Sequence, residues 1–509
     1  MQAHSRRLAL HSLLIMVGFV GSRILGLVRN IVIAQQFGTG REYEAFLAAI
    51  EVPDLVFQVL AGGAVGSAFI PVFASYIARG ERREAWHLTN SVMALAAVGT
   101  GAVAIVMMLL AGPITALLVP GWGTEDQALT ASLMRTMLVT PVLFAVSGFA
   151  TSVLNSFQRF VATMLAPIFY NLAIIAAAAL LPFGIHGVAL GVCAGAALHL
   201  LVQVPGLIQQ GMPFRPGLDF RHDGVRQVGK LMVPRMFGLG VVQINQLVNV
   251  VLATFLVAGS LAYLKIAWLM IMTPLVFAMS VSTAAFPALA EQIAQGRREA
   301  ARDLFVLALR TILFLTVPMA VGLAVLGQPI ISLLFERGQF TGESSRLTAY
   351  ALGFYALGLA GHAVVEIVDR VFYALKDTRT PVLVGACAVA GNIVLGVLLM
   401  QTPLDYGGLA LANSVAALTE ALILLYLARD RLGGVPLTTI ATSFGRVILS
   451  ATIMGAVVYS VGPTLMANLA LLGGVAAACV LGALVYGALA LALKSPELVQ
   501  LLNLRRVGP

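Results

Sequence analysis

Five ionisable side chains stand inside two apolar stretches near the start of the chain. Arg23 and Arg29 interrupt the first stretch, and Glu44, Glu51 and Asp54 interrupt the second. An ionisable group at membrane depth costs roughly 2.5 kcal/mol or more, so such residues usually face protein or a water-filled cavity. Arg23 and Arg29 are six residues apart, which places them about 120° apart around a helix, on neighbouring turns. Both guanidinium groups can therefore reach one cavity.

Paired arginines on a cavity wall are typical of an anion receptor, because the guanidinium fork binds phosphate through two hydrogen bonds. The alternative is that both residues lie near the ends of their helix and extend toward lipid headgroups. The elements that position these residues decide between the two interpretations.

Composition indicates a polytopic membrane protein. Hydrophobic residues make up 60% of the 509 residues and charged residues only 10%, against about 25% charged in soluble domains. The mean hydropathy is +0.95. The net charge of +9 then reflects basic loops on one side of a membrane rather than nucleic-acid binding. Cys193, Cys387 and Cys479 lie far apart in apolar stretches, so we expect neither a metal site nor a disulfide.

The apolar stretches predict an all-α fold, because only helices satisfy their backbone inside lipid when the period-2 pattern of a barrel is missing. A span needs about 20 apolar residues. This criterion predicts fourteen spans, at 8–36, 44–78, 88–111, 128–156, 160–182, 185–209, 228–257, 260–292, 303–326, 346–374, 380–400, 405–428, 439–460 and 468–493.

Basic residues divide unevenly between the connections. With the N-terminus inside, 20 Lys and Arg residues fall in or beside the inner segments, and 3, Arg41, Arg337 and Arg346, in the outer ones. This asymmetry follows the positive-inside rule and predicts an even number of spans with both termini cytoplasmic. The first apolar run has no small-residue cleavage site, so we expect it to be retained as a span.

An internal repeat divides the chain. PVFASYIARG at 71–80 returns as PALAEQIAQG at 287–296, an offset of 216 residues, and SRILG at 22–26 parallels PRMFG at 234–238. Six spans per copy is an even number, so both copies share one orientation, as in transporters whose halves face a central cavity. We expect one half at 1–215, a second at 216–432 and two additional helices within 433–509.

No catalytic constellation is present, because the sequence lacks GxSxG, HExxH and P-loop motifs. We expect a transporter rather than an enzyme, without a cofactor or metal. Its driving force would be an ion gradient, the membrane potential or the gradient of the substrate.

Further polar residues stand inside the spans. Arg235 and Lys265 are additional cationic candidates for the cavity. Lys265 either faces the cavity or lies near enough to the outer end of its span to reach water. The secondary candidates are Asn30, Asn249, Glu366 and Arg370. The last two are four residues apart, so they can instead pair along one helix face.

Five motifs follow one another along the chain: SRILGLVRNIVIAQQFG, EAFLAAIEVPDL, GSAFIPVFASY, LLFERGQFT and FYALKDTRTP. In this order they resemble motifs of the MurJ/MviN family, lipid II flippases of the MOP exporter superfamily. The resemblance covers roughly residues 10–430 with the same fourteen-span plan. SRILGLVR together with FERGQFT and FYALKDTRTP is specific, whereas each alone is weaker.

The resemblance implies two six-helix halves around a cationic cavity, and two extra helices that form a groove for an undecaprenyl tail. It implies transfer of lipid II, a pyrophosphate-linked peptidoglycan precursor, from the inner to the outer leaflet of the bacterial inner membrane. Arg23 and Arg29 match the two first-span arginines of the family. We expect a monomer whose partners are the undecaprenyl-linked lipid, membrane lipids and the cell-wall synthesis machinery, without nucleic acid.

Several positions depart from the family pattern. Glu44 stands where Asp is usual and Asp54 where Asn is usual, while Asn30 replaces an acid. Leu269 replaces an eighth-span arginine, and Lys265, one turn away, could return a cation to the same face. Members with a sodium site place acids or amides at positions occupied here by Asn249, Asn392 and Gly396. An arginine pair and a Glu-Gly pair of the family are replaced by Phe57, Gln58, Gly62 and Gly63.

These observations favour a lipid II flippase that works by alternating access. Arg23 and Arg29 would hold the pyrophosphate, Lys265 and Arg235 would assist, and Glu44 and Asp54 would position the arginines or gate the cavity. Three alternatives remain at this stage: a flippase for another polyprenyl-linked glycan, a small-molecule exporter of the same superfamily, and a cell-wall scaffold that has lost transport.

Overall fold

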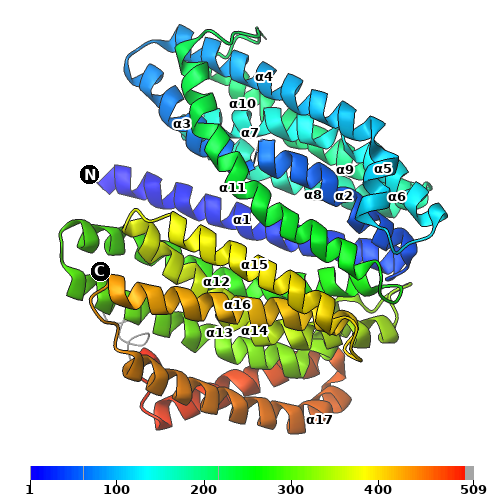
Figure 1. Cartoon of the computed structure of the whole chain (residues 1–509), viewed down its shortest axis with the longest axis vertical. Coiled ribbons are helices and arrows are strands. Elements are labelled where there is room, and N and C mark those ends of the chain that lie inside the picture. Colours follow the sequence, from blue (N-terminus) through cyan, green and yellow to red (C-terminus); the bar gives the residue numbers. More distant parts are fainter. Residues whose placement is uncertain (1, 61, 216, 499–509) are drawn as a thin grey trace. The chain divides into compact units, whose positions relative to one another are not determined.

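The computed structural model describes residues 2–60, 62–215 and 217–498, and every regular element in these ranges is an α-helix (Figure 1). This confirms the predicted all-α membrane fold. The chain divides into two compact units, Met1–Gly259 with Arg337–Phe340, and Ser260–Glu336 with Thr341–Pro509. The seventh predicted span lies in the first of these units. The repeat-based halves, 1–215 and 216–432, stay a prediction about sequence ancestry and transport.

The first unit contains eleven helices in its described residues. α1 pairs with α8, α8 with α9, and α11 packs on α2 and α3. The bounds are α1 (Gln2–Phe37), α2 (Arg41–Leu60), α3 (Gly62–Ala78), α4 (Arg82–Leu109), α5 (Ala111–Leu118), α6 (Thr124–Met137), α7 (Thr140–Ser156), α8 (Phe160–Leu180), α9 (Gly184–Leu201), α10 (Val204–Gln209) and α11 (Asp223–Ala253).

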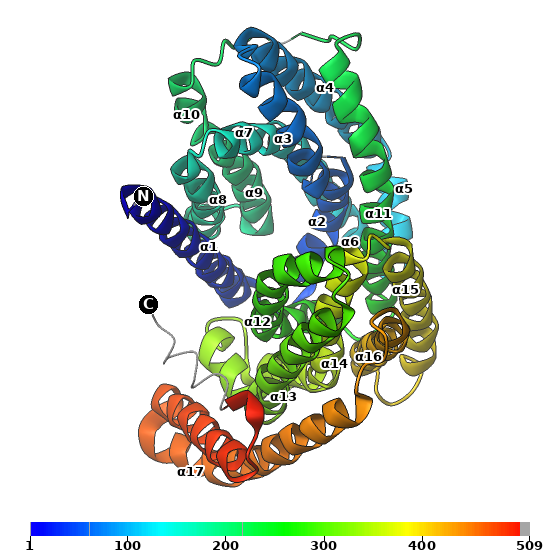
Figure 2. The ribbon, with the colours of Figure 1, turned by 90° about the vertical axis from the view of Figure 1, so that its left-hand side faces the viewer.

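The second unit has α14 at its centre, in contact with α12, α13 and α16, while α17 packs on α13. The bounds are α12 (Ser260–Ala294), α13 (Arg298–Phe335), α14 (Gly342–Ala374), α15 (Arg379–Leu399), α16 (Tyr406–Arg431) and α17 (Leu437–Ala492). α17 is two limbs, because Ala470 has φ 56° and ψ 170°. The limbs fold back on one another in Figure 2, and the break falls two residues inside the last predicted span, 468–493.

Ten helices or helix pairs in the described residues are long and apolar enough to cross a membrane. Several agree closely with the predicted spans; for example, 260–292 corresponds to Ser260–Ala294. The total of fourteen stays a prediction, since this criterion treats α17 as one span and leaves out α1, α2, α3 and α11.

An aromatic core joins α3, α4 and α7. Phe69 and Phe73 lie one turn apart on α3, with ring centroids 5.3 Å apart, and Phe69 meets Phe149 of α7 edge-on at 5.4 Å. Trp86 of α4 lies 5.8 Å from Phe73. Three of these rings are fully buried and Trp86 is 5% exposed. Large buried aromatic rings dominate packing energy, so this core fixes how α3, α4 and α7 are arranged.

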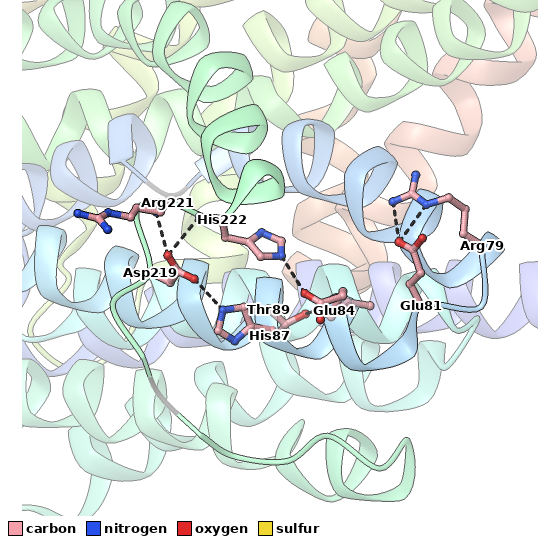
Figure 3. Close-up of polar contacts among 9 residues, drawn as sticks. Arg79, Glu81, Glu84, His87, Thr89, Asp219, Arg221 and His222 are labelled. Atoms are coloured by element: carbon pink, nitrogen blue, oxygen red, sulfur yellow. Dashed lines mark hydrogen bonds and ion pairs between the residues drawn. The ribbon is translucent and has the colours of Figure 1, made fainter.

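Residues 210–215 and 217–222 connect α10 to α11 and are tied across α4. The guanidinium of Arg82 donates to the carbonyl of Gln210 at 2.6 Å, and the Asn90 amide donates to the carbonyl of Pro213 at 2.7 Å. His87 Nε2 lies 2.9 Å from Asp219 Oδ2. Figure 3 shows these imidazole and carboxylate groups at the start of α11.

Asp219 holds the end of this connector. Its Oδ1 accepts the backbone N–H groups of Arg221 at 2.8 Å and of His222 at 3.1 Å. The His87 hydrogen bond, followed by that from the Arg221 backbone, holds the pKa of Asp219 below its usual value. His222 in turn places Nε2 3.4 Å from Glu84 Oε2. The connector is therefore held by polar contacts, together with the packing of Met212 on the aromatic core.

A second tie lies at the far end of α1. The segment Arg337–Phe340 belongs to the first unit, and the N–H of Gln339 donates to the Gln35 carbonyl at 2.8 Å. Gly38 has φ +60°, and a Cβ there would meet the Gln339 carbonyl oxygen at 2.6 Å. Only glycine avoids both the backbone strain and this collision. The FERGQFT motif therefore ends in a close backbone contact with α1.

Candidate functional site

Arg29 lies where α1, α2 and α8 meet. Its guanidinium carbon is 6.0 Å from the ring centroid of Tyr170 on α8, and its Nη2 is 3.4 Å from Asn30 Oδ1. The charges of Arg29 and Asp54 both act on the Tyr170 hydroxyl, and that of Arg29 also acts on Tyr43 of α2. Arg29 is half-buried. The structure thus brings Arg29 into contact with Asn30 and the Tyr170 ring.

Arg23 and Asp54 are both exposed in the first unit. Arg23 precedes Arg29 by less than two turns of α1. α1 lies against α8 at Gly18, where a Cβ would meet Met164 at 2.8 Å. Close packing at a small residue fixes the rotation of α1. The cationic residues are therefore positioned by a helix–helix contact, and their side chains remain accessible.

Glu44 is placed differently from the other candidates. Its side chain is 1% exposed, and its Oε2 accepts from Arg41 Nη1 at 2.9 Å. Arg41 also lies 3.7 Å from Asp126 and 4.9 Å from the Trp122 ring centroid. The buried Glu44 therefore pairs with Arg41, which like Asp126 remains about one-third exposed. This burial fits Glu44 as a residue that positions Arg41 better than as one that contacts substrate. The sequence did not single out Arg41, although its spacing to Glu44 allows a pair along one helix face.

Three other candidates lie on α11 and α12, which are not among the helices that meet at Arg29. Lys265 lies half-buried on α12 in the second unit, close in sequence to Trp268, whose ring meets His362 at 5.3 Å. Asn249 is half-buried on α11. The side chain of Arg235 lies outside the described part of the structure. The convergence of Lys265 and Arg235 on the Arg23–Arg29 site stays a prediction.

An acidic cluster surrounds Arg370 on α14. Arg370 Nη2 lies 3.8 Å from Glu366 Oε2, as expected for a pair four residues apart. The negative charges of Glu420 on α16 and Glu366 also act on Asp369, which neighbours Arg370. Sequence analysis missed the α16 member, because only packing of α14 on α16 brings it near. Among the described residues, no three His, Cys, Asp or Glu side chains form a possible metal site.

Comparisons with known proteins match this architecture. The family model "Lipid II flippase MurJ" matches residues 33–475. A probable lipid II flippase MurJ from Haemophilus influenzae is 32% identical over 459 residues, covering 86% of this chain and 89% of the relative. One from Vibrio cholerae is 30% identical over 434 residues, covering 82% of each.

Solved structures agree. A structure of lipid II flippase MurJ in an inward closed conformation has a TM-score of 0.80 at 26% identity, covering 96% of this chain and 100% of that chain. An inward-facing multidrug resistance MATE transporter of the MOP superfamily has a TM-score of 0.69 at 14% identity, covering 81% of this chain and 94% of that one. The latter similarity concerns the fold alone. With a family model matching most of its length, the chain belongs to the lipid II flippase MurJ family.

Proposed function

We propose that this chain transfers lipid II from the inner to the outer leaflet of the bacterial cell membrane. The observation that carries the proposal is the setting of Arg29, a half-buried guanidinium in apolar α1 whose carbon lies 6.0 Å from the Tyr170 ring centroid. Guanidinium groups bind phosphates bidentately, and a pyrophosphate offers several oxygens at once. The relatives from Haemophilus influenzae and Vibrio cholerae are both named as probable lipid II flippases, which supports lipid II as the substrate of this chain.

In this proposal Arg23 and Arg29 hold the pyrophosphate. Asp54 keeps the Arg29 guanidinium oriented and gates its release, since a carboxylate competes with phosphate for the same donors. Glu44 acts through Arg41 and thus positions the N-terminus of α2. Lys265 and Arg235 add positive charge when the substrate is bound, and Lys265 takes the place of the arginine missing at Leu269.

The transfer itself would follow alternating access between halves 1–215 and 216–432, with 433–509 accepting the undecaprenyl tail. Parallel repeats of six spans are the usual basis of such motion. Both termini would lie in the cytoplasm. The ties among Arg82, Gln210, His87 and Asp219 support a common side for these residues, which the charge asymmetry assigns to the cytoplasm.

The test is a depletion-rescue experiment. Bacterial cells depleted of their own flippase receive this chain, and lipid II exposed at the outer leaflet is measured. We expect rescue by the unaltered chain and loss of rescue by the R23A/R29A double variant. Arg135→Ala is the control, because Arg135 also lies inside a predicted span, 128–156, but donates to the Met108 carbonyl of α4.

Failure of the unaltered chain to restore lipid II exposure, despite stable expression, would contradict the proposed function. Rescue by the R23A/R29A variant would contradict only the assignment of the two arginines. Equal loss of exposure in the R135A variant would indicate a general effect of removing charge from the spans.

A further inference from the structure

A cavity of about 340 Å³ lies in the first unit, on different helices from those that carry Arg23 and Arg29. Its walls come from the α7–α8 turn, the first turns of α8, and the end of α9 with α10. The residues that line it include Arg159, Val161, Leu165, Val202, Pro205 and Gln209.

The cavity is positively charged at its mouth and apolar along its walls. Arg159 is the one charged residue that lines it, and in the described part of the chain its exposed guanidinium makes no ion pair. Arg82 adds a second positive charge nearby, since it donates to the Gln210 carbonyl and lies 5.9 Å from the Phe157 ring centroid. Gln210 directly follows the lining residue Gln209, and Phe157 directly precedes the lining residue Gln158. The mouth therefore attracts an anion.

The surrounding surface is suited to hydrocarbon. α8 and the α9–α10 pair are both apolar enough to span a membrane, and the cavity lies where α8 begins and α10 ends. Val161 is 59% exposed, Leu201 58% and Ile208 67%. Apolar side chains exposed on spanning helices face lipid chains. A ligand seated at Arg159 would therefore extend from the interface into the bilayer.

We propose that this cavity binds the headgroup of an anionic phospholipid, with its phosphate at Arg159 and its acyl chains along Val161 and Leu165. Ligand pockets usually occupy about 300–1,000 Å³. A volume near the lower limit suits a headgroup and glycerol, while the chains remain in the membrane. The walls contain no carboxylate that would repel a phosphate. This lipid site adjoins α1 at Met164 but is not lined by Arg23 or Arg29, and the proposal does not rest on the proposed transport site.

The experiment measures lipid binding to the purified full chain by native mass spectrometry, with phosphatidylglycerol and phosphatidylcholine titrated separately. We expect Arg159→Gln to weaken phosphatidylglycerol binding about fivefold, the effect of one basic residue near an anionic lipid. Gln209→Glu should also weaken it while leaving Arg159 in place. Arg159→Lys should restore most of the affinity. Arg83→Gln, an exposed arginine outside the cavity, is the control and should bind as the unaltered chain does.

Four results would overturn the proposal. They are equal phosphatidylglycerol binding by the R159Q and unaltered chains, equal binding of phosphatidylcholine and phosphatidylglycerol, displacement of the lipid by millimolar inorganic phosphate, and a loss in R83Q as large as in R159Q. If R159Q does not fold, Q209E decides, and unchanged binding by Q209E counts against the site. Binding is measured without lipid II, so the outcome is independent of transport.

Discussion

The contact between Arg29 and Tyr170 is the most specific one around the proposed pyrophosphate site. The guanidinium carbon lies 6.0 Å from the ring centroid, near the limit at which cation–π attraction holds a side chain in place. The ring face, rather than the hydroxyl, makes this contact. Tyr170 should therefore act as a positioning residue for Arg29.

Two substitutions of Tyr170 distinguish the contribution of its ring from that of its hydroxyl. Tyr170→Phe retains the ring and should leave outer-leaflet exposure of lipid II unchanged. Tyr170→Leu removes the ring and should lower the rate about two- to fivefold, since a cation–π contact at this distance is worth about 0.5–1 kcal/mol. The rate is measured in the rescue strain at matched expression. A loss in Y170F as large as in Y170L would contradict the role of the ring.

Asp219 predicts how acid affects the connector. Its pKa in the folded chain is lowered, first by the His87 hydrogen bond and then by the Arg221 backbone. Asp219 therefore stabilises the fold at pH values above its unfolded pKa of about 3.9, and this contribution is lost as pH falls through the lower folded pKa. The groups facing Asp219 are His87, Arg221 and His222.

Asp219→Asn should consequently lower the Tm of the purified chain at pH 5–7, and the difference from the unaltered chain should shrink progressively as pH falls below about 4. Thermal unfolding in detergent across this range is the measurement. Glu42→Gln, which alters an exposed carboxylate elsewhere in the first unit, should show no such gap. A Tm difference that persists unchanged at pH 3 would contradict the assignment to the Asp219 charge.

Single residues differ in how far sequence could place them. Arg23 and Arg29 were found because charge inside an apolar stretch needs an explanation. The Glu366–Arg370 pair followed from its spacing on one helix. Tyr170 and Asp126 could not be found, because they reach Arg29 and Arg41 only through packing of helices distant in sequence. The same holds for the buried contact of Ser147 with His199 at 2.6 Å.

Among the elements, the two copies of the repeat use the same helix end. Gly80 has φ +77° and Gly296, 216 residues later, has φ +73°. The N–H groups of Glu81 and Arg297 both donate at 3.0 Å to carbonyls five residues earlier, those of Tyr76 and Gln292. The same cap also follows Gln158 and Lys376, as is common at helix ends, so the common origin of the two copies stays a prediction.

Glu497 ties the end of the chain to the second unit. Its side chain is 1% exposed and accepts from Arg310 Nε of α13 at 2.7 Å, and it also accepts from Ser443 of α17 and from Ser495. Glu497→Ala removes the carboxylate that neutralises Arg310 and leaves this guanidinium, which is 18% exposed, with only the Ser443 hydroxyl at 3.3 Å. Removing one partner of a fully buried pair costs about 3–5 kcal/mol, which is the upper limit for this pair. We expect a marked fall in the Tm of the purified chain.

The double variant R310M/E497M tests whether the isolated charge is the cause. Replacing both partners with apolar residues is often neutral, so this variant should recover most of the Tm lost by E497A. If both variants unfold at the same lowered temperature, shape rather than charge accounts for the loss.

Helix existence was predictable from apolar runs, but breaks within them were not. The run 128–156 is α6 and α7, separated at Leu138 and Val139 just before Pro141, and 185–209 is α9 and α10. Proline before a new helix start is a known signal, but a run of apolar residues hides it. α11 was assigned to the second half by its repeat, whereas compactness places it in the first unit. Repeat ancestry and packing are separate properties.

For the whole molecule, the charges of the protein and of its proposed substrate indicate which driving force can power transport. The two positions at which the family resemblance implies carboxylates of a sodium site hold Asn249 and Gly396, and a hard cation prefers charged oxygen ligands. The proposed substrate carries negative charge on its pyrophosphate. Moving one elementary charge across 100 mV is worth roughly 2.3 kcal/mol. A membrane potential that is negative inside therefore favours outward transfer of this anion.

Purified chain in vesicles that contain lipid II should consequently respond to voltage rather than to sodium. At a fixed potential, replacing Na⁺ with K⁺ should leave the transfer rate unchanged within twofold. Imposing 100 mV, negative on the cytoplasmic side, should raise it several-fold, and reversing the polarity should slow it, because the anion then moves against the field. A rate that follows Na⁺ at zero potential would instead require a cation site built from neutral oxygens such as Asn249 and Asn392.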